Sequence, residues 1–353
     1  MVQKTVPRIN FECATRTNTE HLFCSSSEAV ELLAQSLLDA FEDVGFFVVY
    51  NHGIDPAVLG NLKEEAANFF GCPTQCKEEF VRRDPKREMF GYTAQDKSTE
   101  VFDRSKPSDI KETFEFSPNG LDPVPSEEWQ RCRELLSGQF SDLFHKMLVL
   151  LARALGLKSS EILTNKIKGL GKGQDGSEGV KNRSAFRSAL YPQVKKEKLL
   201  PNQLRCGLHC DYGCLTFIYK TPFEKGLKAK QRGGDMIDVF CSEEGDLIVN
   251  AGECLQMITG DLIRAAPHLV QFPTAATETS CDNYAIIPSA FSLIMFGLFD
   301  DDAQVETIEQ IGHTRSGHKK TTLYAPFMFG DYFDMRINKV FVEGQGLIQE
   351  LLE

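Results

Sequence analysis

The sequence predicts a mixed α/β region followed by a β-rich region that folds as a β-sandwich or barrel. In the first third, apolar residues recur at helical spacing from Glu28 to Asp43 and then run without interruption from Gly45 to Gly53. From Phe186 onward, short apolar stretches alternate with turn residues, which is typical of sheets that pack against each other. The change of period therefore marks a change from mixed structure to strands.

Local periodicity predicts the individual elements in order. Val6 to Phe11 has the composition of a short strand, and the apolar run from Gly45 to Gly53 predicts a buried strand that ends in a turn. Helical spacing of apolar residues predicts three helices, the last of which ends near a glycine: Glu28 to Asp43, Pro56 to Phe70, and Trp129 to Leu155.

These elements divide the chain into three parts, which we expect to form one compact unit. Residues 1–165 form an α/β region that packs on the barrel, and residues 185–353 form the barrel core with a C-terminal segment. Residues 166–184 are rich in glycine and charge and show no apolar period, so they predict a flexible loop. This loop lacks the G-K-[ST] ending of a phosphate-binding loop, and no helical pattern follows it.

Composition restricts the classes of partner. The 353 residues carry a formal net charge of -11, which argues against binding to the phosphate backbone of nucleic acids. No apolar run reaches the roughly 18 residues that span a bilayer, and the first residues show no secretory signal. Eleven cysteines without such a signal indicate reduced thiols. We expect a cytoplasmic monomer that acts on a small molecule.

The stretch "LRCGLHCDYGCLTFIY" contains the side chains best suited to catalysis or metal binding. As a strand it places alternate residues on opposite faces, with His209 and Asp211 on one of them. We expect the other face to carry three reduced, metal-free thiols that pack behind the strand: Cys206, Cys210 and Cys214.

A distant histidine completes a candidate metal site. An imidazole and a carboxylate two residues apart on a strand can occupy adjacent positions on one metal ion. With a second histidine they form a facial triad, which suits non-haem Fe(II) because three positions stay open for oxygen and a cosubstrate. His268 lies among apolar residues in the β-rich half, whereas His313 and His318 lie in a polar stretch. We therefore predict that His209, Asp211 and His268 bind the metal.

These residues and the stretches around them resemble a known family, the plant-type and isopenicillin-N-synthase-like 2-oxoglutarate/Fe(II)-dependent dioxygenases. "GLHCDYGCLTFIY" is similar to the family's G-x-H-T-D-x-G-x-L-T-x-L. A second family motif, G-D-x-L-Q-x-x-T-N-G-x-x-K-S-x-x-H, is matched at its own spacing by five residues: Gly252, Leu255, Gln256, Thr259 and His268. Upstream, "AFEDVGFFVVYNHGI" and "DIKETFEF" resemble the N-terminal region, and "FMFGDYFDMRINKVF" resembles the closing segment.

The resemblance implies a fold and an activity. The fold is a mainly β double-stranded β-helix of the jelly-roll or cupin kind, with helices packed outside and an N-terminal α/β region. The activity is that of an oxygenase that uses Fe(II), 2-oxoglutarate and O2 to hydroxylate, desaturate or cyclise a small organic substrate. A carboxylate-bearing amino-acid derivative or another natural product is the expected substrate.

Two departures concern the cosubstrate. The family's Arg-x-Ser, which binds the far carboxylate of 2-oxoglutarate, is matched by Ala290 and Ser292, and its Asn-x-Tyr keeps only Tyr191. Since a buried carboxylate without a cation is costly, either another residue replaces the arginine or the cosubstrate differs. Arg187 shares the face of Tyr191 if the strand is regular, and Arg264 takes the family's lysine position. We predict Arg187 as the replacement, with Arg264 second.

A basic segment follows the first metal strand. "KTPFEKGLKAKQRGGD" concentrates positive charge in an acidic protein, and we interpret it as a solvated loop near the mouth of the barrel that can also attract an anionic substrate. The missing arginine leaves two alternatives open beside the oxygenase. One is an Fe(II) oxidase that does not use 2-oxoglutarate, and the other is a non-catalytic binding module on the same fold.

Overall fold

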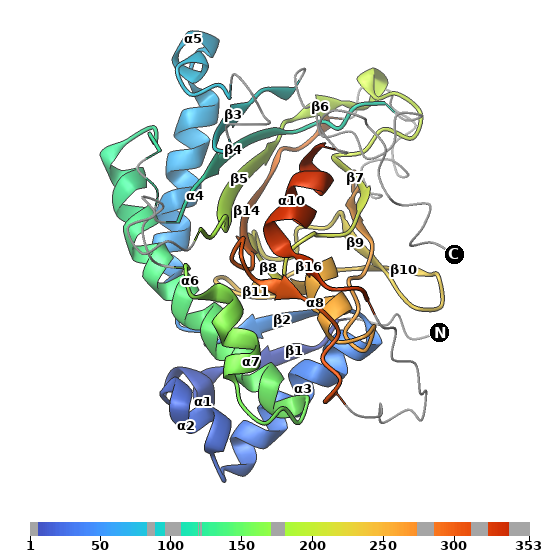
Figure 1. Ribbon diagram of the computed structural model, residues 1–353. Coiled ribbons are helices and arrows are strands. Elements are labelled where there is room, and N and C mark those ends of the chain that lie inside the picture. The colour runs from blue at the N-terminus through green and yellow to red at the C-terminus, as the bar shows by residue number, and fades with distance from the viewer. Residues whose placement is uncertain are drawn as a thin grey trace.

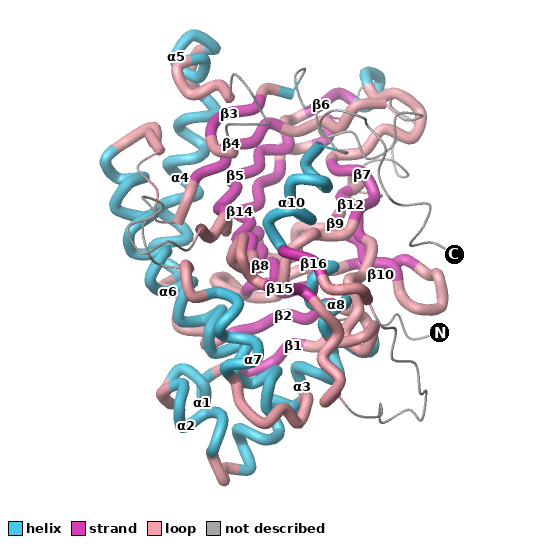
Figure 2. Tube along the Cα trace, viewed as in Figure 1, coloured by secondary structure: helices cyan, strands magenta, loops and turns pink. Residues whose placement is uncertain are grey.

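Two sheets face each other in the computed structural model, which describes residues 6–82, 89–95, 107–118, 120, 122–170, 181–273, 286–311 and 324–338. Figure 1 shows helices on the outside of the larger sheet and α10 in front of the space between the sheets. The tube view makes the two groups of strands easiest to separate (Figure 2). Such a pair of closed sheets is the architecture of a double-stranded β-helix.

The larger sheet has eight strands, and its neighbours run antiparallel except for β1 with β2. Their order across the sheet is β1 (Arg8–Asn10), β2 (Phe46–Tyr50), β11 (Leu247–Ala251), β8 (Leu215–Lys220), β14 (Ala290–Gly297), β5 (Ala185–Tyr191), β4 (Glu112–Phe116) and β3 (Gly91–Thr93). Strands from the first third of the chain thus extend the barrel sheet at both edges.

The smaller sheet closes the barrel. Its order is β10 (Met236–Asp238), β9 (Leu227–Lys230), β12 (His268–Val270) and β7 (Cys206–His209). Two short ribbons complete the strands: β13 (Ile286–Ile287) with β6 (Val194–Lys195), and β15 (Gln304–Val305) with β16 (Phe327–Met328).

The described helices include three long amphipathic ones from the first half of the chain, α3, α4 and α6. In chain order the helices are α1 (Glu12–Thr15), α2 (Thr19–Cys24), α3 (Glu28–Asp43), α4 (Pro56–Gly71), α5 (Thr74–Glu78), α6 (Glu127–Ala154), α7 (Glu161–Thr164), α8 (Glu253–Ile258) and α10 (Phe329–Asn338), with 3-10 turns at Asn165–Ile167 and Lys196–Lys198. None of the described helices has the length and apolar content needed to cross a membrane.

Strand β8 shows how the larger sheet divides its two faces. Leu215, Phe217 and Tyr219 point to the outer face and join the large apolar core under the helices. The residues between them, Thr216, Ile218 and Lys220, line a cavity between the two sheets. Because alternate residues face opposite sides, one apolar strand can serve both a core and a site.

Helix α6 covers the outer face of the sheet. Its Ser126 cap accepts a hydrogen bond from the Trp129 backbone N–H, and the helix is followed by Gly156 in a left-handed conformation. Trp129 is fully buried and packs edge to face against Phe114 and Phe116 of β4. These contacts attach the N-terminal helices to the barrel.

The predicted elements of the first half match the structure within about two residues at most ends. The helix predicted from Glu28 to Asp43 has those bounds, and the helix predicted from Pro56 ends one residue later, at Gly71. Of the expected loop 166–184, residues 171–180 lie outside the described residues. The residues beside them are packed, since Gly169 N–H donates to Asp300 and Asn182 is buried.

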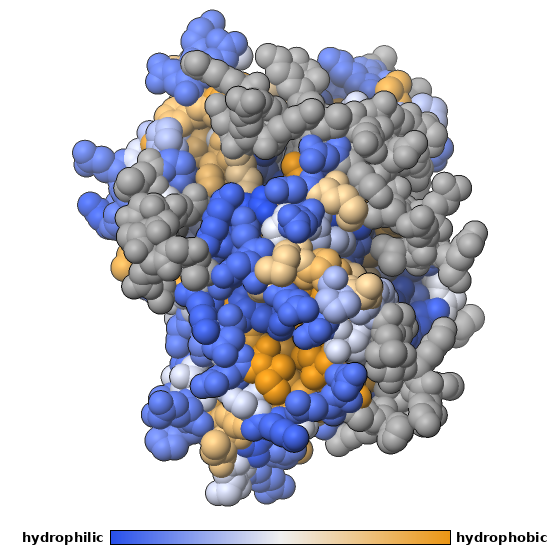
Figure 3. Space-filling view, in the orientation of Figure 1, coloured by the Kyte–Doolittle hydropathy of each residue, from blue (hydrophilic) through white to orange (hydrophobic). Residues whose placement is uncertain are grey.

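The basic segment is the clearest correction at this level. It is not a solvated loop, because Lys220 is the buried last residue of β8 and the following residues form β9 and β10 of the smaller sheet. Lys228 there pairs with Asp238 across the two strands. The viewed face of the molecule is largely hydrophilic, with a hydrophobic patch in its lower half (Figure 3).

The packing of Trp129 yields a stability prediction. Trp129→Ala leaves a large cavity in the aromatic cluster, so we expect the free energy of unfolding to fall by about 3 to 5 kcal/mol. Trp129→Phe should lose far less, because the indole Nε1–H finds no hydrogen-bond partner among the described residues. Urea unfolding followed by far-UV circular dichroism measures both, since the chain has no other tryptophan to report fluorescence. Equal losses in the two variants would contradict this account.

Candidate metal centre with two adjoining cavities

The pairing of β7 with β12 brings the two predicted histidine ligands together. His209 and His268 are direct partners in this antiparallel pair, and their ring centroids lie 4.3 Å apart. Asp211 follows β7 by two residues. One ligand atom from each of the three side chains lies within 4.8 Å of the others, so the structure brings together the set that the sequence predicts.

Backbone hydrogen bonds orient both imidazoles. His209 Nδ1 lies 2.8 Å from the Gly207 carbonyl, and His268 Nδ1 lies 3.1 Å from the Ala266 carbonyl. A carbonyl only accepts, so each Nδ1 carries the proton and each Nε2 keeps a lone pair. The two Nε2 atoms face Asp211 Oδ1 at 3.7 Å and 3.9 Å, which is the arrangement of three donors around a shared position.

The Asp211 carboxylate is held in place by a buried side-chain hydrogen bond. Asn250, a fully buried residue of β11, donates from Nδ2 to Asp211 Oδ2 at 2.7 Å. Burial raises the pKa of Asp211, but the His268 and His209 imidazoles and the hydrogen bonds from Asn250 and Thr216 outweigh it and leave the pKa below its ordinary value. Asp211 is therefore ready as an anionic ligand.

His268 is prepared in the complementary sense. Burial and the neighbouring His209 lower the pKa of His268 to about 4, so the ring is neutral at physiological pH. The neutral imidazole is the form that binds a metal ion. Phe46 packs edge to face against the ring at 5.2 Å between centroids and holds its plane.

A tight backbone contact fixes the loop that carries Asp211. The N–H of Glu253 at the start of α8 donates to the Asp211 carbonyl at 2.8 Å, and the N–H of Gly252 donates to the Cys214 carbonyl at 2.9 Å. A Cβ on Gly252 would lie 2.3 Å from the Gly213 carbonyl oxygen, a distance that no side chain permits. Because Gly213 and Gly252 have no Cβ, the start of α8 can lie in backbone contact with this loop.

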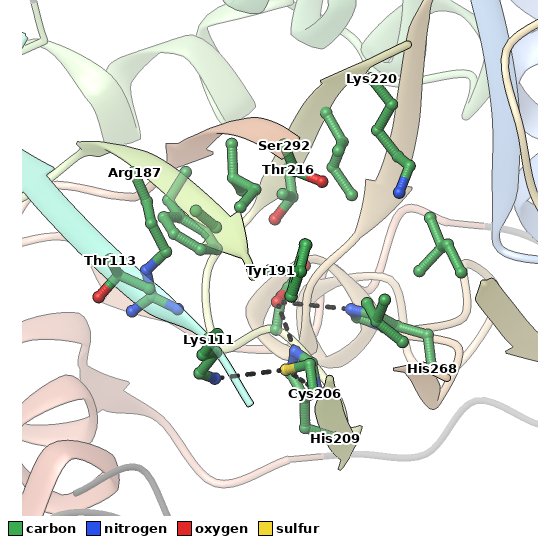
Figure 4. Close-up of a pocket in the computed structure, with 17 residues that line it drawn as sticks. Lys111, Thr113, Arg187, Tyr191, Cys206, His209, Thr216, Lys220, His268 and Ser292 are labelled. Atoms are coloured by element: carbon green, nitrogen blue, oxygen red, sulfur yellow. Dashed lines mark hydrogen bonds and ion pairs between the residues drawn. The ribbon is translucent and has the colours of Figure 1, made fainter. Parts of the chain in front are cut away.

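The inner cavity lies between the sheets and ends at the three ligands (Figure 4). Its polar lining includes both residues expected from the family's cosubstrate motifs, Tyr191 and Ser292, which are 4% and 3% exposed. Burial raises the pKa of Tyr191, so its hydroxyl is a neutral hydrogen-bond donor. The cations of this lining are the buried Lys111 and Lys220 and the partly buried Arg187.

The outer cavity adjoins the ligands from the other side. His209, Asp211, Arg187 and Phe296 line both cavities, so the candidate centre borders both spaces. Helix α10 covers the outer one and contributes Phe333 and other residues to its lining. Two imidazoles and one carboxylate with open sides are the donor set of an Fe(II) centre that must admit further ligands, so the residues present fit that ion.

Helix α10 is fastened beside the ligands by a buried ion pair. Arg336 Nη1 lies 2.8 Å from Glu253 Oε2 of α8, and the Arg336 guanidinium lies 4.2 Å above the Tyr212 ring. Tyr332 also donates to Glu253. These contacts connect α10, which covers the outer cavity, to α8 and to Tyr212, the residue after Asp211.

The two arginines named from the sequence differ in position. Arg187 lies inside the barrel on the face of Tyr191, and its Nε is 2.6 Å from Glu115 Oε1 on β4, at ion-pair distance but without hydrogen-bond alignment. Arg264 lines neither of the two cavities and donates to the Lys230 carbonyl at 2.6 Å. No observation here supports Arg264 as a carboxylate ligand.

The expected separation of thiols from ligands is wrong for Cys206 and Cys210, whereas Cys214 packs in the large apolar core as expected. Cys206 lines the inner cavity, 4.0 Å from His209 Nδ1, and Cys210 lines the outer one. Strand β7 ends at His209 and its pairing with β12 contains an irregularity, so strict alternation does not extend through Cys210. The cysteines among the described residues are free thiols, as predicted, and Cys281, His313 and His318 lie outside these residues.

Sequence reasoning missed four polar residues of the site. Asn250 is the single polar residue of the otherwise apolar strand β11, which was an available signal, whereas Glu115 is one of three polar residues in β4. Arg82 lies 3.8 Å from Glu115, and Lys111 Nζ lies 3.3 Å from Asp109 and 3.5 Å from Cys206. No local pattern marks these last two.

Known families match both halves of the chain. Residues 14–135 match the N-terminal region of non-haem dioxygenases, described for morphine synthesis, and residues 181–286 match the 2OG-Fe(II) oxygenase superfamily. A proline hydroxylase of Petromyces alliaceus is 25% identical over 294 residues, covering 80% of this chain and 86% of that protein. A homoarginine-6-hydroxylase of Arabidopsis thaliana is 27% identical, covering 65% and 63%.

Solved structures share the fold. A full-length Neurospora crassa protein in complex with alpha-KG superimposes with a TM-score of 0.72 at 24% identity, covering 94% of this chain and 95% of that one. A rice dioxygenase for auxin oxidation gives a TM-score of 0.64 at 18% identity, covering 97% of both chains. Both alternatives left open by the sequence, an oxidase without 2-oxoglutarate and a non-catalytic module, disagree with the family matches. The chain belongs to the 2-oxoglutarate- and Fe(II)-dependent oxygenases, dioxygenases that use O2 and act on small organic substrates.

Proposed function

We propose that this oxygenase binds Fe(II) through His209, Asp211 and His268 and oxidises an amino acid or amino-acid derivative that carries a carboxylate. The observation that carries the substrate class is the charge in the outer cavity. Arg82 and Arg187 both line it, and Glu115 lies between them. Counted over the described residues that line this cavity beside the ligands, two guanidinium groups and one carboxylate sum to one positive charge.

This cluster suits a carboxylate-bearing substrate on electrostatic grounds. The Arg82 and Glu115 side chains are 7% and 5% exposed, so water screens their charges poorly. A substrate carboxylate would neutralise the cluster, and a substrate ammonium group would have Glu115 as a partner. The hydroxylases of proline and homoarginine among the relatives support an amino-acid substrate.

The residues of the chain would position the reactants. Iron at the three ligands supplies the activation of O2 that is coupled to decarboxylation of 2-oxoglutarate. The inner cavity would hold 2-oxoglutarate, while α10 and the arginines would hold the substrate on the opposite side and exclude water. The position of the substrate carbon nearest the ligands decides between hydroxylation, desaturation and ring closure.

A paired-substrate assay tests the proposal. The protein is loaded with Fe(II), and succinate formation from 2-oxoglutarate is measured with L-proline, L-homoarginine and related amino acids, each beside its methyl ester. We expect an acid to stimulate succinate formation at least tenfold more than its ester, because only the acid neutralises the arginine cluster. Equal stimulation by acid and ester, or stimulation by uncharged compounds alone, contradicts a carboxylate-bearing substrate.

Removal of the outer cations should weaken substrate binding selectively. A charge-assisted hydrogen bond contributes roughly 1.5 to 3 kcal/mol, so Arg82→Met should raise the KM for the acid about tenfold or more. Bound metal should stay at the wild-type level, because Arg82 is not among the ligand residues. Arg131→Met, which changes an arginine that is 67% exposed on α6, is the matched control. An unchanged KM in Arg82→Met places the substrate elsewhere.

The metal centre makes a separate prediction. Asp211→Ala should abolish activity and most metal binding, since it removes the anionic ligand. Asn250→Ala leaves the ligands in place but frees Asp211 Oδ2, so the affinity for Mn(II) or Fe(II) should fall about 10- to 100-fold. Anaerobic titration calorimetry measures both variants, with the exposed Asn61→Ala as control. Wild-type affinity in Asn250→Ala would show that this hydrogen bond does not hold the carboxylate.

A further inference from the structure

The inner cavity needs a cation that the sequence motif does not supply. In the position where the family places an arginine, β14 carries Ala290, although Ser292 two residues later is kept. A dicarboxylate that reaches the three ligands with one end places its second carboxylate deeper between the sheets. That space is largely closed to water, so an unpaired carboxylate there would be unfavourable.

Lys220 has the position of the missing cation. It is the last residue of β8 and is 2% exposed, and it lies directly opposite Ser292 in the pairing of β8 with β14. Ala290 is then its diagonal neighbour on the adjacent strand, and such neighbours lie roughly 7 to 8 Å apart, within reach of a long side chain. A lysine at 220 and an arginine at 290 would therefore serve the same space.

The direction of the side chain agrees with this position. Residues 216, 218 and 220 of β8 all line the inner cavity, so Lys220 follows the inward alternation of its strand. Figure 4 shows its amine turned toward the cavity on the side of Ser292 and Thr216, away from His209. The kept serine and the lysine thus face the same end of the cavity.

The other two cations of this cavity are engaged elsewhere. Arg187 lies opposite Glu115 in the pairing of β4 with β5 and has its Nε 2.6 Å from that carboxylate. It also lines the outer cavity, beside the ligands. Lys111 lies beside Cys206 at the ligand end, with its amine 3.3 Å from Asp109.

Lys220 has a carboxylate partner of its own, and the local charges still favour an anion. Glu224 Oε1 lies 2.6 Å from Lys220 Nζ, at ion-pair distance but without hydrogen-bond alignment. An ammonium group has three donors and can serve a second carboxylate. The buried Arg205 also interacts electrostatically with Glu224, so two cations share this one anion. One further carboxylate makes this group neutral.

We propose that Lys220, together with Ser292 and Tyr191, binds the far carboxylate of 2-oxoglutarate, so that the cation which the family carries on β14 is here supplied by the neighbouring strand β8. The proposal rests on the use of 2-oxoglutarate by the family and not on the substrate class proposed above. It replaces the expectation that Arg187 has this role.

The test compares two 2-oxo acids that differ in the far carboxylate. The full-length protein is loaded with Mn(II), and dissociation constants for 2-oxoglutarate and 2-oxobutanoate are measured by calorimetry in wild type and in Lys220→Met. We expect the constant for 2-oxoglutarate to rise at least tenfold and that for 2-oxobutanoate to change less than twofold, because only the first has a second carboxylate. Bound Mn(II) should match wild type, as it should in Lys225→Met, an exposed lysine of the same segment.

Two further variants protect the test against loss of folding. Lys220→Met leaves the partly buried Glu224 without its ion-pair partner, so Lys220→Met/Glu224→Gln removes both charges, and Lys220→Arg keeps the cation. We expect the double variant to lose 2-oxoglutarate affinity like the single one, and Lys220→Arg to restore it to within a few fold. The proposal is overturned if Lys220→Met binds 2-oxoglutarate as wild type does, or if both 2-oxo acids weaken equally. It is also overturned if Arg187→Met alone abolishes the preference for the dicarboxylate.

Discussion

The site depends above all on the register between β7 and β12. This pairing sets His209 directly opposite His268, and a shift by one residue would turn one imidazole to the other face of the sheet. The carbonyls of Gly207 and Ala266 then fix the tautomer of each ring, so the two nitrogen donors are prepared by backbone alone. Only the carboxylate needs a separate support. Asn250 of β11 donates to Asp211 Oδ2, and the Glu253 N–H of α8 donates to the Asp211 main-chain carbonyl.

The larger sheet divides its two faces between packing and the site. Strands β5, β8 and β14 direct one set of side chains into the core under α6 and the other into the inner cavity. The aromatic contacts of Phe140 with Phe186 and Phe217 belong to the first set. The second set is free to be polar, because hydrophobic burial on the outer face already stabilises the strands.

The buried charges of the inner cavity follow one pattern, in which each cation has a carboxylate nearby. Lys111 has Asp109, Arg187 has Glu115, and Lys220 has Glu224. Such pairing makes three cations tolerable in a space that water hardly reaches. It also keeps these donors oriented before an anion binds.

Sequence periodicity predicted those parts of the fold that depend on neighbouring residues. Helix α3 has the predicted bounds, and the His-x-Asp pair with His268 is brought together as the motif spacing implied. The failures involve partners far apart in the chain. Cys206 was assigned to the wrong face because the irregularity in β7 depends on its pairing with β12.

Lys220 shows the same limit from another direction. In the sequence, Lys220 belongs to the same basic segment as Lys225 and Lys228, because no neighbouring residue marks position 220 as the end of a buried strand. The role of Asn250 requires Asp211, 39 residues away, and that of Glu115 requires Arg187, which no period relates to it. Burial and pairing partner are properties of the assembled sheet, so they could not be read from the strand alone.

Arg187 lies where the two cavities meet. Its position links the proposal on Lys220 with the proposal on the substrate. Arg187 lines both spaces, so the sequence, which offered it as the nearest inward cation, could not say which anion it meets. With Lys220 as the proposed cation at the far end of the inner cavity, no second cation from Arg187 is needed there. Its pairing with Glu115, and the proximity of Glu115 to Arg82, then direct its charge toward the outer cavity under α10. One cation on each side of the ligands lets two different carboxylates approach the same centre without sharing a partner.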